Sequence, residues 1–220
     1  MNRLAIFDCD GTLVDSGAPI HAALRESFAR HGLIAPPPEI SQRVIGLSLV
    51  QAIAALIPDA SPADHAAIAE SYKQSFIQAR SQGRVEEPLY PGIAELLAVL
   101  EADGWLLAVA TGKSDRGLDH CLRCHGLSER FISLQTGDRH PSKPHPSMAL
   151  LAMADAGASP ESTIVVGDTA FDMGMAVAAG ARGIGAGWGY HNAEDLLAAG
   201  AVGVADRPMD VLGLLMEKTQ

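Results

Sequence analysis

Short apolar runs that end abruptly in polar or turn-forming residues recur along the chain. The four clearest runs are residues 4–7, 105–110, 131–134 and 163–166, and weaker ones lie at 183–188 and 202–204. The first stops at Asp8, and the second ends at Thr111 and Gly112. Runs of this length, bounded by turn residues, are typical of buried parallel strands. We therefore expect a sheet built from these segments.

Helical patterns lie between the apolar runs. Segment 93–100 carries apolar residues at helical spacing, with Pro91 ahead of it and Gly104 just past its end. These are start and stop signals in the expected order. Segments 147–156 and 171–179 are similar, and each is followed by a glycine. Strands that alternate with helices indicate an α/β fold, a doubly wound parallel sheet covered by helices on both faces.

The alternation is interrupted after the first strand, because residues 15–88 show no convincing strand pattern. Helical stretches are expected there at 18–31, 39–44, 48–57 and 62–81, separated by prolines. This arrangement predicts a small all-helical domain inserted into the sheet domain. We expect residues 1–14 and 89–220 to form the core and residues 15–88 to form a helical cap.

Charge and composition narrow the class of partner. The 16 basic and 26 acidic side chains give 16 − 26 = −10, and 48% of the residues are hydrophobic. A net negative globular chain repels phosphate backbones and anionic lipids, so we expect neither nucleic-acid nor membrane partners. Residues 1–10 lack the long apolar stretch of a signal peptide. We expect a cytoplasmic protein, either a monomer or a dimer, that acts on a small molecule.

Polar residues that suit phosphoryl chemistry follow the predicted strands. They are Asp8 and Asp10 after the first, Thr111 at the second, Lys143 after the third, and Asp168 and Asp172 after the fourth. Ligands of open parallel sheets bind at the carboxyl ends of strands, so these residues are expected to converge. A carboxylate pair can hold Mg²⁺ or divide the roles of nucleophile and acid. A lysine and a hydroxyl suit the oxygens of a phosphoryl group.

The same segments resemble the four motifs of the haloacid-dehalogenase-like (HAD) superfamily. Residues 7–16 (FDCDGTLVDS) are similar to its first motif, 110–114 (ATGKS) to its second, 142–146 (SKPHP) to its third and 166–172 (VGDTAFD) to its fourth. They occur in the family's order and span most of the chain. The insert after the first motif resembles the helical cap of the phosphoglycolate-phosphatase-like subgroup. The resemblance implies a Rossmann-like core and a phosphoric monoester hydrolase.

The resemblance also implies a role for each matched residue. Asp8 would attack phosphorus and form an aspartyl-phosphate, and Asp10 would act as the general acid and then as the base. Mg²⁺ would be held at a metal site made by Asp8, Asp10 through its backbone carbonyl, and Asp168, with Asp172 as a further metal-shell or lysine-orienting acid. Thr111, the Gly112 backbone and Lys143 would bind the transferring phosphoryl group. The implied substrate is a small phosphorylated metabolite, with phosphoglycolate as the default.

Several alternatives stay open at this point. A phosphomutase of the same superfamily, similar to beta-phosphoglucomutase, shares the core residues and differs in the fate of the aspartyl-phosphate. A non-enzymatic phospho-receiver module also gathers Asp, Thr and Lys, although it needs neither a cap nor an acid at Asp10. The C-x-x-C-H pattern of residues 121–125 suggests a haem or metal carrier, but we interpret it as helix packing. In the cap, Arg43 is the basic candidate for contacting the non-reacting end of a substrate.

Overall fold

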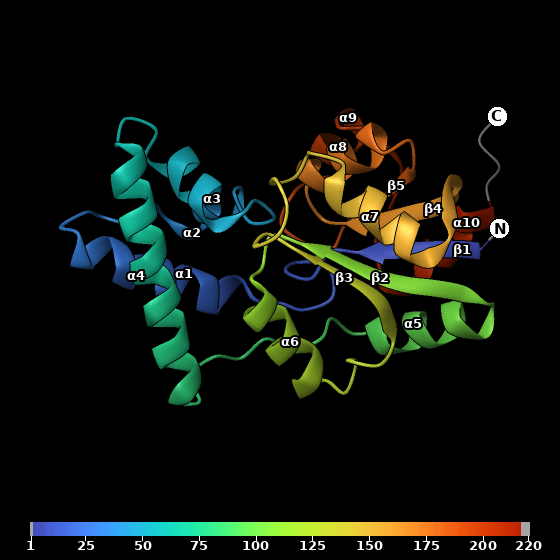
Figure 1. Cartoon of the computed structure of the whole chain (residues 1–220), viewed down its shortest axis with the longest axis horizontal. Coiled ribbons are helices and arrows are strands. Elements are labelled where there is room, and N and C mark those ends of the chain that lie inside the picture. The colour runs from blue at the N-terminus through green and yellow to red at the C-terminus, as the bar shows by residue number, and fades with distance from the viewer. Residues whose placement is uncertain (1, 217–220) are drawn as a thin grey trace.

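In the computed structural model of the chain, which describes residues 2–216, six strands form one parallel sheet (Figure 1). Its spatial order is β3-β2-β1-β4-β5-β6. The strands are β1 (Asn2–Phe7), β2 (Trp105–Thr111), β3 (Phe131–Thr136), β4 (Ala158–Gly167), β5 (Arg182–Ala186) and β6 (Ala201–Ala205). Every apolar run of the sequence is thus a strand, and β4 begins earlier than predicted.

Helices cover both faces of the sheet because its central strands are buried on both sides. In β1, Leu4 and Ile6 pack on one face, with α7 (Ser147–Ala156) and α8 (Ala170–Ala178). Ala5 and Phe7 pack on the opposite face, with α5 (Ile93–Ala102) and α6 (Asp115–Cys124). Alternate strand residues point to opposite faces, which explains the division. The elements α9 (Ala193–Ala198), the 3-10 turn η1 (Pro208–Asp210) and α10 (Val211–Met216) lie against β6. The predicted doubly wound fold is confirmed.

The strand order fixes the position of the site. Chain connections run outward from β1 to β2 and β3 on one side, and from β4 to β5 and β6 on the other. Phe7 of β1 is paired with Val166 of β4, so the two strands end at the same level. Open α/β sheets bind ligands in the crevice at such a reversal, because the loops on either side diverge.

Four helices form a separate part, which we call the cap, on the left in Figure 1. They are α1 (Gly17–Arg30), α2 (Pro38–Gln42), α3 (Leu49–Leu56) and α4 (Pro62–Ser81). The cap has its own buried cluster, which includes Phe28, Ile53 and Ile68. Helix α4 begins with a capping box between Ser61 and Asp64, and this pairing stabilises its free N–H groups.

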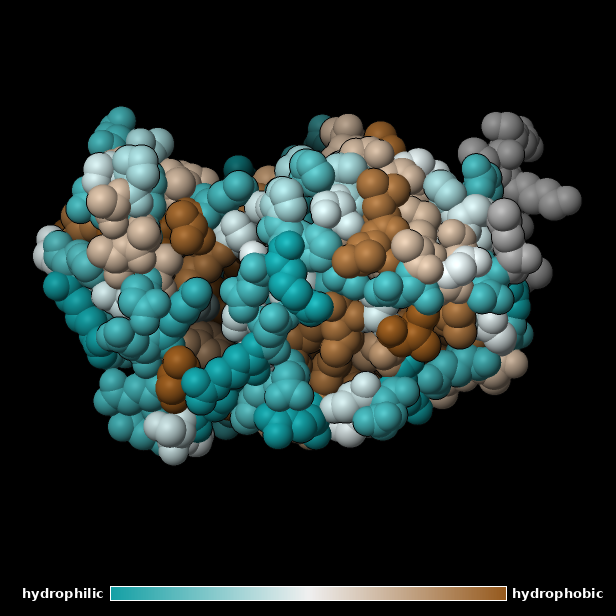
Figure 2. Space-filling view, viewed as in Figure 1, coloured by the Kyte–Doolittle hydropathy of each residue, from teal (hydrophilic) through white to brown (hydrophobic). Residues whose placement is uncertain are grey.

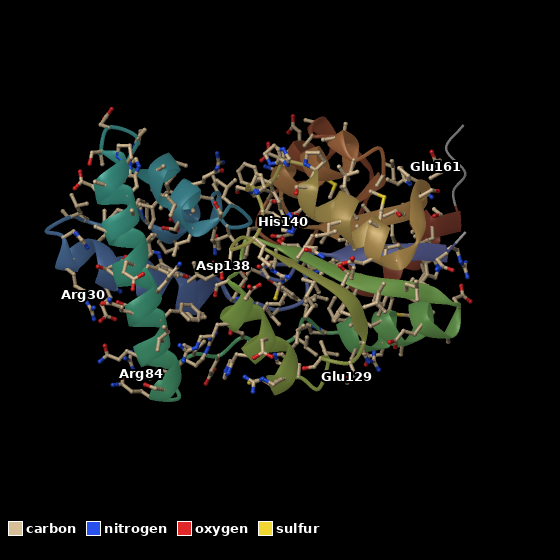
Figure 3. The ribbon with its side chains drawn as sticks, viewed as in Figure 1. Arg30, Arg84, Glu129, Asp138, His140 and Glu161 are labelled. Carbon is tan, nitrogen blue, oxygen red and sulfur yellow. The ribbon has the colours of Figure 1, made fainter. Side chains whose placement is uncertain are left out.

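Charged side chains are spread over the outside of both parts. Figure 3 labels Arg30 and Arg84 on the cap side, and Glu129 and Glu161 on the core. Among residues 2–216, no helix combines the length and the apolar character needed to cross a membrane. The buried charges, by contrast, gather at the boundary between the cap and the core.

Candidate active site

Three of the residues singled out in the sequence meet at the reversal of strand order. Asp8 directly follows β1, Thr111 is the last residue of β2, and Asp168 directly follows β4. Their side chains are almost excluded from water, with exposed fractions of 1%, 1% and 0%. The backbone N–H of Asp8 donates a hydrogen bond to the carbonyl of Val166 at 3.0 Å, which ties β1 to β4 at this level.

Lys143 lies buried between two carboxylates. Its ammonium is 2.9 Å from Asp8 Oδ1 and 2.6 Å from Asp172 Oδ1. Asp172 is held in turn by a capping box with Thr169 at the start of α8. Burial by itself would lower the pKa of Lys143, but Asp172 and Asp8 outweigh it and raise that pKa above its ordinary range. The lysine is therefore a fixed positive charge beside Asp8, suited to phosphoryl oxygens.

Three carboxylates form a group that fits a hard divalent cation. Asp8, Asp168 and Asp172 each offer an oxygen, and these oxygens lie within 4.8 Å of one another. Within the described chain, Asp8 Oδ2 is buried without a hydrogen-bond partner. Because Mg²⁺ prefers carboxylate oxygens and relieves the repulsion between such charges, this donor set fits Mg²⁺.

Burial determines the electrostatics of two of these carboxylates. Burial raises the pKa of Asp8 to about 7, against the lowering effect of Lys143 and with support from Asp172 and Asp10. Burial, together with Asp8 and Asp172, likewise raises the pKa of Asp168 well above its usual range. A divalent cation beside Asp8 and Asp168 would therefore favour their ionised forms.

Asp168 is oriented by two loops that approach it closely. Its Oδ1 accepts from the Thr12 hydroxyl at 2.9 Å, and its Oδ2 accepts from the backbone N–H of Tyr190 at 2.9 Å. A side chain at Gly189 would place its Cβ 2.1 Å from Asp168 Cβ, so only glycine fits there. The segment after β5 thus borders the site and fixes the orientation of the carboxylate.

Asp10 makes different contacts from the other site carboxylates. Its Oδ1 accepts from the Ser16 hydroxyl at 2.5 Å and from the Lys113 ammonium at 2.5 Å. Lys113 also pairs with Glu87 at 2.8 Å. The Asp10 side chain does not belong to the group of three carboxylates. The resemblance implies that Asp10 contributes its backbone carbonyl to the metal rather than its carboxylate, and the position of the side chain outside the group of three is compatible with that prediction.

The second motif lies directly under the cap. A side chain at Gly112 would place its Cβ 2.3 Å from the carbonyl oxygen of Leu47, so glycine permits the close approach of the loop between α2 and α3. The same loop is held by the backbone N–H of Ser48, which donates to the Ser142 hydroxyl at 2.8 Å. The cap therefore closes over the strand ends that carry Thr111 and Gly112.

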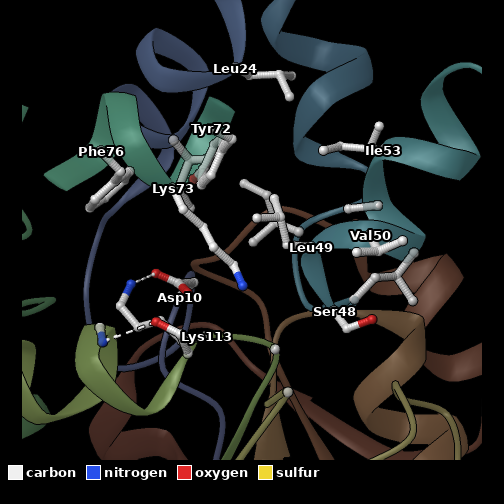
Figure 4. Close-up of a pocket in the computed structure, with 18 of the residues that line it drawn as sticks. Asp10, Leu24, Ser48, Leu49, Val50, Ile53, Tyr72, Lys73, Phe76 and Lys113 are labelled. Atoms are coloured by element: carbon white, nitrogen blue, oxygen red, sulfur yellow. Dashed lines mark hydrogen bonds and ion pairs between the residues drawn. The ribbon is translucent and has the colours of Figure 1, made fainter. Parts of the chain in front are cut away.

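The structure does not bring Arg43 to the pocket between the cap and the core. Its side chain is exposed and is not part of the pocket lining, while its backbone carbonyl lies 3.3 Å from Nε2 of His191. Helix α4 instead provides Lys73, whose side chain extends into the pocket in Figure 4. No ion pair is formed by Lys73 within residues 2–216. Lys73 is thus the better-placed cap cation.

None of the three cysteines belongs to the group of three carboxylates. Cys121 is buried on α6, and its sulfur is 3.9 Å from that of Cys9, while Cys124 is exposed. Nowhere in residues 2–216 do His, Cys, Asp or Glu side chains form a second group of three suited to a metal. Cys9 and Cys121 belong to the apolar cluster on the α5 and α6 face, as free cysteines often do.

Four residues of this site were not assigned from the sequence: Ser16, Glu87, Lys113 and Lys73. Ser16 and Lys113 stand inside the first and second motif segments, so their place beside the strand ends could have been inferred. Glu87 belongs to the link that returns from the cap, and Lys73 to a long helix. Nothing in their local pattern distinguishes them from surface charges.

Comparisons with known proteins agree with this geometry. A model of the haloacid dehalogenase-like hydrolases matches residues 5–186. The chain is 35% identical over 217 residues to a "Probable phosphatase IndB" of Dickeya dadantii, covering 97% of this chain and 93% of that protein. It is 30% identical to "Phosphoglycolate phosphatase 1" of Pseudomonas aeruginosa, covering 96% and 78%. A hydrolase from Pseudomonas syringae superimposes with a TM-score of 0.86 at 27% identity, and all of both chains is covered. The chain belongs to the haloacid dehalogenase-like hydrolase family, among its phosphatases.

Proposed function

We propose that the protein is a Mg²⁺-dependent phosphatase that hydrolyses a small phosphate monoester through an aspartyl-phosphate on Asp8. The observation that carries the proposal is the buried Oδ2 of Asp8, which has no partner in the described chain although Lys143 and two carboxylates surround that side chain. Because Oδ1 of Asp8 is paired with Lys143, Oδ2 is the oxygen that remains to attack phosphorus.

In the first half-reaction, Asp8 Oδ2 forms a bond to phosphorus while the ester P–O bond breaks. Mg²⁺, when bound, neutralises the carboxylates and draws charge from the phosphoryl oxygens. Lys143, the Thr111 hydroxyl and the Gly112 N–H hold those oxygens. Asp10 gives its proton to the leaving oxygen, which departs as an alcohol.

In the second half-reaction, the Asp10 carboxylate takes a proton from water, whose oxygen bonds to phosphorus as the Asp8–phosphorus bond breaks. Inorganic phosphate and free Asp8 result. Ser16 and Lys113 both bond Oδ1 of Asp10, which leaves Oδ2 to carry the proton in each direction. Fixing one oxygen in this way orients the acid toward the ester.

The test measures release of inorganic phosphate by the purified protein, with Mg²⁺ or with a chelator. Phosphoglycolate is the first metabolite to assay, because a relative bears its name, and an aryl phosphate serves as the generic substrate. We expect Mg²⁺-dependent turnover that Asp8→Asn abolishes. Asp15→Asn, an exposed aspartate of the same segment, is the matched control and stays active. Turnover by Asp8→Asn would overturn the nucleophile, and turnover in chelator would overturn the metal dependence.

The fate of the phosphoryl group separates the alternatives. A phosphatase passes it to water, so phosphate is released with every turnover. A mutase would return it to a sugar and release little phosphate. A receiver module would keep a stable phosphoryl group after treatment with acetyl phosphate, without turnover. Either of these last two results would contradict the proposal.

A further inference from the structure

A pocket opens beside Asp10 between the cap and the core. It has a volume of about 430 Å³, and Asp10, Gly112 and Lys113 form part of its core side. Figure 2 shows hydrophobic side chains, in brown, at the hollow between the cap and the core. In the proposed reaction the leaving alcohol departs next to Asp10, so this pocket is the space that the non-reacting part of the substrate enters.

The cap side of the pocket is an apolar wall drawn from three helices. Leu24 of α1, Leu49 and Ile53 of α3, and Tyr72 and Phe76 of α4 contribute to it (Figure 4). Ile53 and Leu24 belong to the buried cluster of the cap, and Leu49 and Tyr72 pack against it. The wall is thus continuous with the hydrophobic core of the cap and is fixed by it.

The aromatic part of the wall is held in place by its neighbours. Tyr72 and Phe76 lie one helical turn apart, and their ring centroids are 5.8 Å from each other. The Arg80 guanidinium lies over the Phe76 ring at 5.1 Å and also pairs with Glu87. These contacts keep the Phe76 ring oriented without a ligand, so the surface is formed before substrate binds.

A wall of this kind is poorly matched to a two-carbon hydroxy acid. Glycolate would fill little of the pocket, whose volume falls within the ~300–1,000 Å³ typical of sites for drug-sized ligands. Its carboxylate could pair with Lys73, but the apolar wall would then stay in contact with water. Covering the wall with hydrocarbon is favourable, because apolar surface then leaves water.

We propose, on the basis of the proposed function, that the substrates are phosphate monoesters whose leaving alcohol carries an apolar body, such as a ring, that packs against Leu49, Tyr72 and Phe76. The substrate class is then defined by hydrophobic contact in the cap rather than by a carboxylate. Phe76 and Leu49 are specificity-determining residues, and phosphoglycolate is a poor substrate.

The experiment compares kcat/KM for methyl phosphate, 2-phenylethyl phosphate and phosphoglycolate in saturating Mg²⁺. The first two release simple alkyl alcohols, so a difference between them reports the binding of the ring. We expect 2-phenylethyl phosphate to exceed each of the other two by roughly 10- to 100-fold, which is the effect of burying one aromatic side group. An equal or lower value for 2-phenylethyl phosphate would overturn the inference.

Variants connect the preference to the wall. Phe76→Ala should lower the ratio of kcat/KM for 2-phenylethyl over methyl phosphate by roughly 10-fold, because the ring loses its contact surface. Leu49→Ala, on a different helix, is the second variant if Phe76→Ala fails to fold. Leu150→Ala, an exposed apolar residue of α7 on the core, is the matched control and keeps the ratio of the unmodified protein. An unchanged ratio in a folded wall variant would overturn the assignment.

The outcomes also separate this inference from the proposed function. No phosphate release from any ester, with Mg²⁺ present, would overturn the phosphatase and this inference with it. Release from all esters with a preference for phosphoglycolate would overturn only the apolar leaving group. Release with a preference for the ring-bearing ester, lost in Phe76→Ala, supports both.

Discussion

Replacing Asp8, the proposed nucleophile, tests the electrostatics of the site through folding rather than through catalysis. Asp8 is 1% exposed, and burial raises its pKa from 3.8 to about 7. Because the folded-state pKa is raised, the protonated carboxyl is the form that favours folding. This contribution is complete below about pH 4 and is lost as the pH rises toward 7.

The magnitude follows from the shift. Each unit of pKa difference is worth about 1.4 kcal/mol, and Asp8 is half ionised in the folded protein near pH 7, so the free energy of unfolding falls by about 2 kcal/mol between pH 5 and pH 7 through this group. Asparagine keeps the shape of the neutral carboxyl and does not ionise. Asp8→Asn should therefore gain stability relative to the unmodified protein as the pH rises, and the gain should level off above pH 7.

The assay is urea unfolding of both proteins from pH 5 to pH 8 in the presence of a chelator. Taking the difference between the two proteins removes the titration of groups that they share. Repeating the series with Mg²⁺ should make the unmodified protein the more stable of the two, because the cation binds the ionised Asp8 carboxylate more strongly than the neutral amide of the variant. A difference that stays flat across the pH range in chelator would refute the raised pKa.

Three further substitutions test other parts of the site. Lys143→Met should cost about 3–5 kcal/mol of unfolding free energy in a urea titration, because it leaves two buried carboxylates without their cation; a change below 1 kcal/mol would contradict the buried ion pairs. Lys73→Met should raise KM for phosphoglycolate roughly 10-fold with little change in kcat, because the carboxylate of this ester loses the pocket cation, whereas Arg43→Met leaves this KM unchanged. Equal effects of the two substitutions would contradict the placement of the two cations. Gly112→Ala should lower kcat/KM about 100-fold without a matching loss in thermal stability, because its methyl group displaces the cap loop that contains Leu47. Normal activity would contradict this prediction, since it would show that the loop can move without affecting the site.

Local pattern was sufficient for the fold because each signal depends on neighbours in sequence. The buried strands β1, β2 and β5 show as apolar runs that stop at turn residues, and burial on both faces produces such runs. The first part of β4 was not predicted, because Ala158–Gly167 begins with polar and proline residues and becomes buried only from Thr163. Helix α6 showed only a partial pattern around its cysteines.

Ligands of parallel sheets bind at the carboxyl ends of the strands, and this rule predicted that the site residues converge. The rule applies only to residues at or directly after the end of a strand. Asp8, Thr111 and Asp168 are placed by the ends of β1, β2 and β4, so their convergence follows from a parallel sheet. No comparable rule predicts where the side chain of a cap residue points. Arg43 and Lys73 are both charged residues of helical segments, and only the packing of the cap helices in three dimensions shows which of them lines the pocket.

The link between cap and core carries chemistry that no single segment contains. Arg80, at the end of α4, pairs with Glu87, and Glu87 shares the Lys113 ammonium with Asp10. The Asp10 side chain is therefore linked by contacts to the helix that bears the apolar wall, because Phe76 lies under the same Arg80 guanidinium. Four charged side chains, those of Arg80, Glu87, Lys113 and Asp10, thus connect the apolar wall of the cap with the loop after β1.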